Sequence, residues 1–183
     1  VILGLMLSLL VLCVLGSLEV SMMGLALVGF LSMTLMGVGP CCELSGVFNL
    51  DLMGQLLVVL TVFISFLMLM SSCSVNGFVS FNTLVLTIGV LLVGAFSVSS
   101  TFLFYVFFES VLFPTLLLIL GWGYQPERLQ AVLYMVIYTV MGSLPFLYGL
   151  SKLYFLSSTD NLGSLLSFID KSVMGFSWLF LLG

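Results

Sequence analysis

The chain has 183 residues, of which 62% are hydrophobic and 5% charged, and its mean hydropathy is +1.42. Soluble domains carry about 25% charged residues, so this composition indicates a membrane protein. Three basic residues against seven acidic ones exclude a nucleic-acid-binding protein, which needs clustered cations, and the high hydrophobicity excludes intrinsic disorder.

The apolar residues fall into runs that are near the length of about 20 residues that a helix needs to cross a membrane. In chain order the six runs are 1–18, 20–38, 52–70, 81–96, 101–120 and 129–155, and a seventh begins as the chain reaches Gly183. Their continuous apolar character favours helices over barrel strands, in which lipid-facing and lumen-facing residues alternate. We therefore predict an all-α, polytopic transmembrane helical bundle that occupies residues 1–183.

The cysteines do not indicate a metal or redox site. Cys13, Cys41, Cys42 and Cys73 form no C-x-x-C pair, and the chain has no His. We predict that these thiols pack as small hydrophobic groups and that the chain binds no metal.

One charged residue lies inside a predicted span. Glu109 is about eight residues, or about 12 Å, from the start of the run 101–120. An acidic residue at the centre of a membrane helix costs about 2.5–3.5 kcal/mol, so such residues usually have a function. We predict a carboxyl that takes up and releases a proton as its electrostatic surroundings change. The alternative is a permanently protonated Glu that makes one interhelical hydrogen bond.

Polar groups and a proline surround this carboxyl in the sequence. Tyr105 lies one turn earlier on the same helix face. Pro114 cannot donate to the carbonyl of Ser110, so that carbonyl and the Ser110 hydroxyl could bind water beside Glu109. The alternative is that Pro114 only kinks the helix for packing.

The sixth run repeats this feature. Pro145 leaves the carbonyl of Met141 without its helical donor, Gly142 and Ser143 stand just before it, and Tyr138 and Thr139 add hydroxyls. Two adjacent broken helices predict an interior polar route, although Pro and Gly also occur in membrane helices for structural reasons alone.

The basic residues are far from Glu109. Arg128 is nineteen residues away, or about 28 Å if the chain is helical throughout, and Lys152 lies toward the far end of the sixth run, where it can reach the interface. We therefore expect no direct counter-ion of Glu109 from these two residues.

Two strings in the second half of the chain are specific enough for a comparison. The first is FYVFFESVLFPT at 104–115, and the second is GWGYQPERLQA at 121–131, with Trp122, Gln125, Glu127 and Arg128; Tyr138, Thr139 and the string GSLP at 142–145 follow. In this order they resemble the chain 4 subunits of mitochondrial NADH-ubiquinone oxidoreductase, respiratory complex I. The dense part of the resemblance covers about a quarter of the chain.

The resemblance implies the N-terminal fragment of a longer antiporter-like subunit of the proton-pumping membrane arm, in the mitochondrial inner membrane. The partners that it implies are other membrane-arm subunits and the lipid bilayer. It also implies that the carboxyl matching Glu109 pairs with a Lys of the seventh span, which the chain barely enters, so that this fragment does not pump alone.

The same resemblance makes the chain a subunit of an enzyme, the proton-translocating NADH:ubiquinone reductase. Electrons then pass from NADH to ubiquinone elsewhere in the complex, on FMN and iron–sulfur clusters, and this chain binds none of these cofactors. Two alternatives stay open on the residues alone, namely a subunit of a multi-subunit cation/proton antiporter of related fold and a membrane scaffold that transports nothing.

Overall fold

The computed structural model describes residues 4, 6, 8, 18–36, 52–72 and 78–157. Five long helices lie in this part of the chain: α2 (Leu18–Met36), α3 (Leu52–Ser71), α4 (Phe78–Ser97), α5 (Thr101–Trp122) and α6 (Arg128–Ser157). Residues 4, 6 and 8 are also helical. The rest of the first predicted span, the connection 39–51, the four cysteines and the start of the predicted seventh span lie outside the described residues.

The structure confirms four of the predicted spans and shows a helix, α2, in the place of the predicted run 20–38. Helices α3, α4, α5 and α6 each contain a segment long and apolar enough to cross a membrane, and α2 contains a shorter apolar segment, Ser21–Thr34. The prediction 81–96 was too short, because α4 begins at Phe78. Ser80 lowers the hydropathy there without ending the helix, since the backbone hydrogen bonds do not depend on this side chain.

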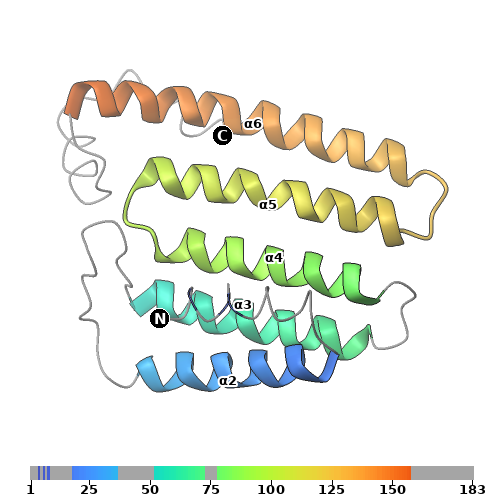
Figure 1. The fold of residues 1–183 in the computed structure, drawn as a ribbon. Helices are drawn as coiled ribbons and strands as arrows, with labels where there is room; N and C mark the ends of the chain where they lie inside the picture. Colours follow the sequence, from blue (N-terminus) through green and yellow to red (C-terminus); the bar gives the residue numbers. More distant parts are fainter. Residues whose placement is uncertain are drawn as a thin grey trace.

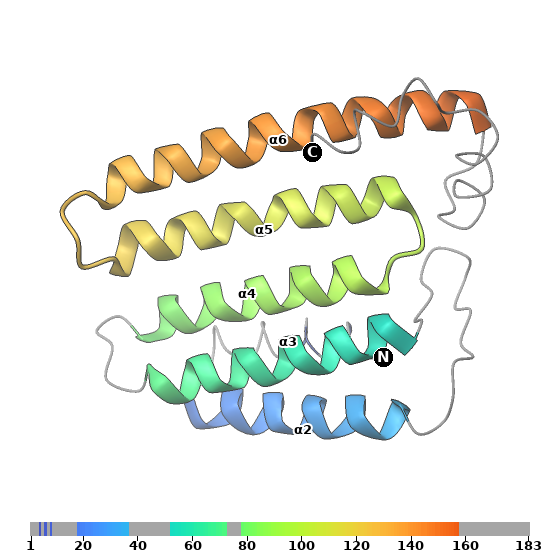
Figure 2. The same cartoon turned by 180° about the vertical axis from the view of Figure 1, so that it is seen from behind.

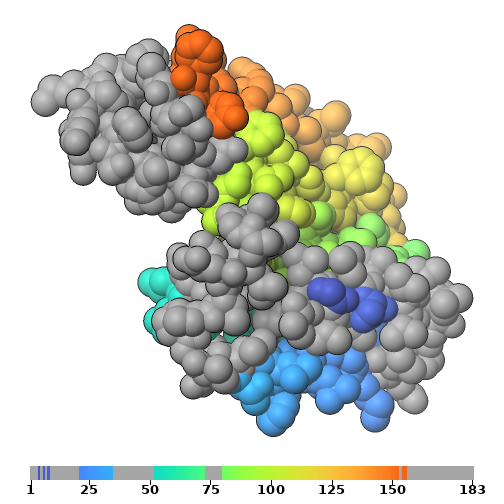
Figure 3. All heavy atoms as spheres, turned by 60° about the vertical axis from the view of Figure 1, so that its left-hand side comes forward, coloured from blue at the N-terminus to red at the C-terminus, as the bar shows by residue number. Residues whose placement is uncertain are grey.

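The helices follow one another in a single antiparallel row, α2, α3, α4, α5 and α6, each packed on its neighbours in the chain (Figure 1). The view from behind has the same order (Figure 2). In the space-filling view α2 and the α5–α6 pair lie at opposite ends of the molecule (Figure 3). The outer faces carry large apolar side chains such as Phe30, Phe63 and Phe113, which suits lipid rather than water.

The hydrophobic core lies among α2, α3 and α4. Apart from Met6, its buried members come from these three helices: Leu25, Val28, Val58, Val62, Leu69, Val85, Leu86 and Val93. On α5 the buried residue is Pro114. Of the span segments, 44% is buried in α4 and 6% in each of α5 and α6. The α5–α6 end of the row is therefore open on most of its surface.

Glycines allow the helices of the row to approach closely. A Cβ added at Gly54 of α3 would lie 2.9 Å from the backbone oxygen of Phe96 in α4. A Cβ added at Gly94 of α4 would lie 3.1 Å from the ring of Phe107 in α5. Membrane helices commonly associate through such small residues, because van der Waals contact replaces the hydrophobic effect in lipid.

A buried polar contact connects α2 to α4. The side-chain amide of Asn82 donates to the hydroxyl of Ser21 at 3.0 Å, and both residues are almost fully buried. Most other hydroxyls of the helices instead donate to a carbonyl three residues earlier in the same helix, as Ser65 does to Val62 at 2.8 Å. A hydroxyl that bonds to its own helix in this way needs no partner on another helix.

Candidate proton-exchange site

Glu109 of α5 faces α6 and is held there through one of its two carboxyl oxygens. Its Oε1 accepts a hydrogen bond from Ser143 Oγ of α6 at 3.2 Å. Its Oε2 is buried and has no hydrogen-bond partner among the described residues. A buried polar atom usually has a partner, so this oxygen indicates a place where a donor can arrive.

Tyr105 joins the same group, as its spacing from Glu109 predicts. Its hydroxyl donates to Ser143 Oγ at 3.4 Å, and its ring lies 6.3 Å from the ring of Phe146 on α6. Tyr105, Ser143 and Glu109 therefore form a chain of hydrogen bonds across the α5–α6 contact.

Ser143 is the residue of this site that sequence reasoning did not select. It was noted only as a neighbour of Pro145 and as part of the string GSLP. The signal that could have identified it is depth: Glu109 lies 13 residues before the end of α5, and Ser143 lies 15 residues after the start of α6. At helical rise both are about 20 Å from the short connection between the helices.

The prolines do not break their helices. α5 continues through Pro114 to Trp122, and α6 continues through Pro145 to Ser157. The prediction of two broken helices was therefore wrong. Neighbouring helical hydrogen bonds can maintain the helix around a single missing donor.

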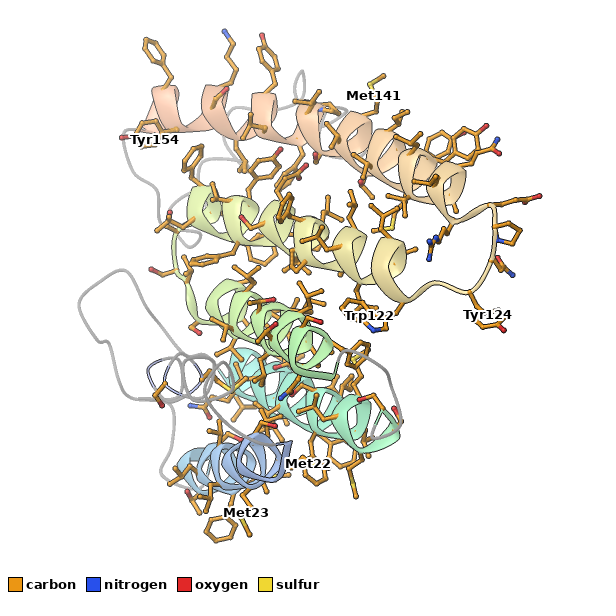
Figure 4. All side chains as sticks on the ribbon, turned by 45° about the vertical axis from the view of Figure 1, so that its right-hand side comes forward. Met22, Met23, Trp122, Tyr124, Met141 and Tyr154 are labelled. Carbon is orange, nitrogen blue, oxygen red and sulfur yellow. The ribbon has the colours of Figure 1, made fainter. Side chains whose placement is uncertain are left out.

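Three of the predicted polar groups point elsewhere. The Ser110 hydroxyl donates to the carbonyl of Val106 at 2.7 Å, and that of Thr139 donates to Met135 at 2.7 Å, so both stay on their own helices. Tyr138 is exposed and its ring pairs with Tyr134 at 6.2 Å. Met141 points away from α5 on the outer face of α6 (Figure 4). Fewer polar side chains therefore gather around Glu109 than the sequence predicted.

The loop motif after α5 makes structural contacts and does not reach Glu109. Arg128 Nη1 donates to the carbonyl of Gly123 at 2.8 Å, and the Gly123 N–H donates to Ile119 at 2.9 Å. The Gln125 carbonyl accepts from the Arg128 N–H at 3.2 Å, and the Glu127 carbonyl accepts from Ala131 at 3.0 Å. These bonds close the end of α5 and start α6.

Trp122 fixes the same end of α5 against α4. Its ring meets that of Phe81 edge to face, with centroids 5.5 Å apart, and Tyr124 projects outward from the loop (Figure 4). A shallow apolar pocket of about 400 Å³ lies here, lined by Phe81, Leu118, Ile119, Trp122 and Gly123. None of its lining side chains can take or give a proton.

In the described part of the chain, no basic side chain contacts Glu109. Lys152 is exposed and its Nζ lies 5.6 Å from the centre of the Tyr148 ring, while Arg128 is engaged in the loop. Among the described residues, no group of three His, Cys, Asp or Glu side chains could hold a metal ion. What the site offers chemically is one carboxyl and two hydroxyls, each able to accept a hydrogen bond and, when protonated, to donate one.

Comparisons with known proteins agree with this architecture. A family described as NADH:quinone oxidoreductase/Mrp antiporter, TM matches residues 97–183. A solved structure described as respiratory complex I from Thermus thermophilus with bound NADH contains a chain with a TM-score of 0.79 and 28% identity, and the match covers 99% of this chain and 41% of that one.

Two curated relatives show the range of coverage. NADH-ubiquinone oxidoreductase chain 4 of Mytilus edulis is 49% identical over 141 residues, which are 77% of this chain and 32% of that protein. The protein of the same name from Phodopus sungorus is 36% identical over 142 residues, 74% of this chain and 67% of the relative. The chain thus spans 32% of the length of the first relative and 28% of its Ceratitis capitata counterpart.

Proposed function

Since this chain belongs to the NADH-ubiquinone oxidoreductase chain 4 family, we propose that it serves in the membrane arm of the proton-pumping enzyme and that Glu109 exchanges the proton. The observation that carries the proposal is the geometry of this carboxyl. One of its oxygens contacts a hydroxyl of the next helix, and the other is buried without a donor among the described residues.

The location follows from the family and from the helices. The protein is a multi-pass protein of the mitochondrial inner membrane, with apolar spans long enough to cross it in α3, α4, α5 and α6. The partners we propose are the other membrane-arm subunits and the surrounding lipid. The exposed apolar side chains of these helices support both, since either partner would cover them.

The proposed mechanism is electrostatic. In a low-dielectric setting a carboxyl loses much of the stabilisation that water gives to its charged form, while a nearby cation restores it. A cation that approaches Glu109 would favour release of the proton, and its withdrawal would favour uptake. The resemblance assigns that cation to a Lys of a later span, and the buried Oε2 is the oxygen left free to receive it.

The redox chemistry belongs to other parts of the enzyme in this proposal. FMN and iron–sulfur clusters supply the electron transfer from NADH to ubiquinone elsewhere in the complex. This chain binds neither these groups nor a metal, and contributes a protonatable side chain.

A second candidate function has one specific observation in its favour. The family that matches 97–183 also includes Mrp antiporters, so a cation/proton exchanger subunit would share these helices and the mid-span Glu. The two differ in the driving reaction: the proposed function requires proton translocation driven by NADH oxidation, whereas an exchanger requires a gradient of sodium or potassium ions. A scaffold that transports nothing leaves Glu109 without a role.

The test is Glu109→Gln in the full-length subunit, assembled in its complex. The variant keeps the size of the side chain and its bond to Ser143 but cannot exchange a proton. NADH-driven proton translocation, measured in sealed vesicles with a pH-sensitive dye, should fall by on the order of 100-fold, the typical loss when a proton-transferring group is removed.

The matched control is Glu127→Gln, which removes an exposed carboxyl of the α5–α6 loop. It should have a much milder effect, because the Glu127 interaction given above uses the backbone carbonyl and not the side chain. Wild-type translocation in Glu109→Gln would refute the proposed role, and so would an equal loss in both variants.

A further inference from the structure

Ser143 has more acceptors than its hydroxyl can serve. Its Oγ lies 3.2 Å from Glu109 Oε1 and 3.2 Å from the carbonyl of Val140 on its own helix. A serine hydroxyl has one proton to donate, so only one of these two bonds can exist at a time. Its lone pairs remain available to Tyr105, whose hydroxyl lies 3.4 Å away.

The bond from Ser143 to its own helix is long compared with that of most helical hydroxyls. Bonds to the carbonyl three residues earlier are 3.1 Å long in Ser72 and Thr139. They are 2.7–2.9 Å long in Ser32, Thr61, Ser65, Thr87, Thr115 and Ser151. In Ser143 the same bond is 3.2 Å. This bond is at the long end of the range, and the Ser143 hydroxyl has a second acceptor at the same distance on the neighbouring helix.

From this geometry we propose that Ser143 is a hydrogen-bond switch that follows the protonation of Glu109. The inference rests on the proposed function, because it requires that Glu109 exchanges a proton. When Glu109 is ionised, the Ser143 hydroxyl donates to Oε1, and Tyr105 donates to Ser143. A hydrogen bond to a charged oxygen is about twice as strong as one between neutral groups, so this acceptor is preferred over the carbonyl.

When Glu109 is protonated, the direction of the bond reverses. The carboxyl O–H donates to Ser143 Oγ, and the Ser143 hydroxyl rotates to the carbonyl of Val140. No proton leaves Ser143 or Tyr105 in this exchange; only the orientation of the Ser143 hydroxyl changes. Both states of Glu109 thus keep a partner, which makes Ser143 a positioning residue for the proton site.

The switch also limits the cost of moving between the two states. Loss of a hydrogen-bond partner in an apolar setting is unfavourable for a hydroxyl and more so for a carboxylate. Here both acceptors of Ser143 are at 3.2 Å, so rotation about one bond is enough to exchange them.

The experiment compares Ser143→Ala with Ser151→Ala in the assembled, full-length complex. Ser151 is a matched control, since its hydroxyl lies on the same helix and donates to Tyr148, three residues earlier, at 2.8 Å. Infrared difference spectra between the NADH-reduced and oxidised complex report the C=O stretch of protonated carboxyls. The Glu109 band is the one absent from Glu109→Gln.

We expect Ser143→Ala to move the Glu109 band to higher frequency, because the carboxyl has lost its partner. It should also lower proton translocation about three- to eighteenfold, the range that corresponds to interhelical hydrogen bonds in membranes. Ser151→Ala should change neither. Ser143→Thr keeps a hydroxyl and should restore both the band and the rate, which also covers the case in which Ser143→Ala fails to assemble.

The outcomes separate the two proposals. Absence of any Glu109 band in the wild-type protein overturns the proposed function. A Glu109 band that is present and has the same frequency in wild type and Ser143→Ala overturns the switch alone. The switch is also overturned if Ser143→Thr assembles but gives the band and rate of a chain without this hydroxyl.

Discussion

The polar side chains of helices α2, α3 and α4 have different hydrogen-bond partners from those of helices α5 and α6. In the first three, hydroxyls donate to their own helix and Asn82 reaches Ser21, within a continuous apolar core. In the last two, Tyr105, Ser143 and Glu109 share hydrogen bonds across the helix contact, and these bonds involve an ionisable group.

This difference indicates that α2, α3 and α4 form a structural support and that α5 and α6 carry the group that changes state. A close-packed interior transmits strain and resists rearrangement, so it suits a support and not a group that must change state. The α5–α6 pair buries little, and a rotation of one hydroxyl there disturbs few neighbours. The predictions below test whether substitutions of equal size affect the two regions unequally.

The largest effect is expected from a methyl group placed between α3 and α4. In Gly54→Ala the new Cβ would lie 2.9 Å from the Phe96 backbone oxygen, which cannot move without moving α4. Overpacking of this kind should lower the free energy of unfolding by about 1–3 kcal/mol. Chemical unfolding of the full-length subunit in detergent would measure it.

Gly142→Ala in α6 is the matched control, because nothing lies within 4 Å of a Cβ at that position. It should be neutral, or stabilising by up to about 1 kcal/mol through helix propensity. Equal destabilisation by both substitutions would remove the distinction between the two regions.

The next effect is expected at the bond between α2 and α4. Asn82→Leu removes the amide that donates to Ser21 and should lower the free energy of unfolding by about 0.6 kcal/mol, and at most about 1.7. Thr83→Val is the control at the adjacent position, since the Thr83 hydroxyl donates to the Ser80 carbonyl of its own helix. A larger loss in Thr83→Val would contradict the structural role of the buried pair.

The smallest effect is expected in the α5–α6 loop. Arg128→Ala removes the guanidinium bond to the Gly123 carbonyl at 2.8 Å and should lower the free energy of unfolding by about 0.5 kcal/mol. The loss should appear as faster hydrogen exchange confined to the last turn of α5. Exchange that rises along the whole of α5 would show that the loop stabilises the site region and not only the helix end.

Much of the architecture could be predicted from the sequence, because hydropathy over about 20 residues is a property of the chain itself. The spans 52–70 and 101–120 agree with α3 and α5 to within two residues at each end. The start of α4 was missed because Ser80, just before the predicted run, lowers the local hydropathy.

The site was only partly predictable. The position of Glu109 inside a span and its spacing from Tyr105 follow from counting residues along one helix. The contact with Ser143 depends on the depth and rotation of a second helix, which no single-helix pattern contains. Ser110 and Thr139 were overestimated, since a hydroxyl next to a functional residue can still bond to its own backbone.

The connection between α5 and α6 has a consequence for how chains of this kind can vary. Its few residues are held at both ends, by the Gly123 N–H on Ile119 and by Arg128 on Gly123. A residue inserted in this turn would move Arg128 relative to Gly123 and so alter the contact that sets the start of α6 and the depth of Ser143 beside the carboxyl. We therefore expect insertions and deletions to be rare in this turn.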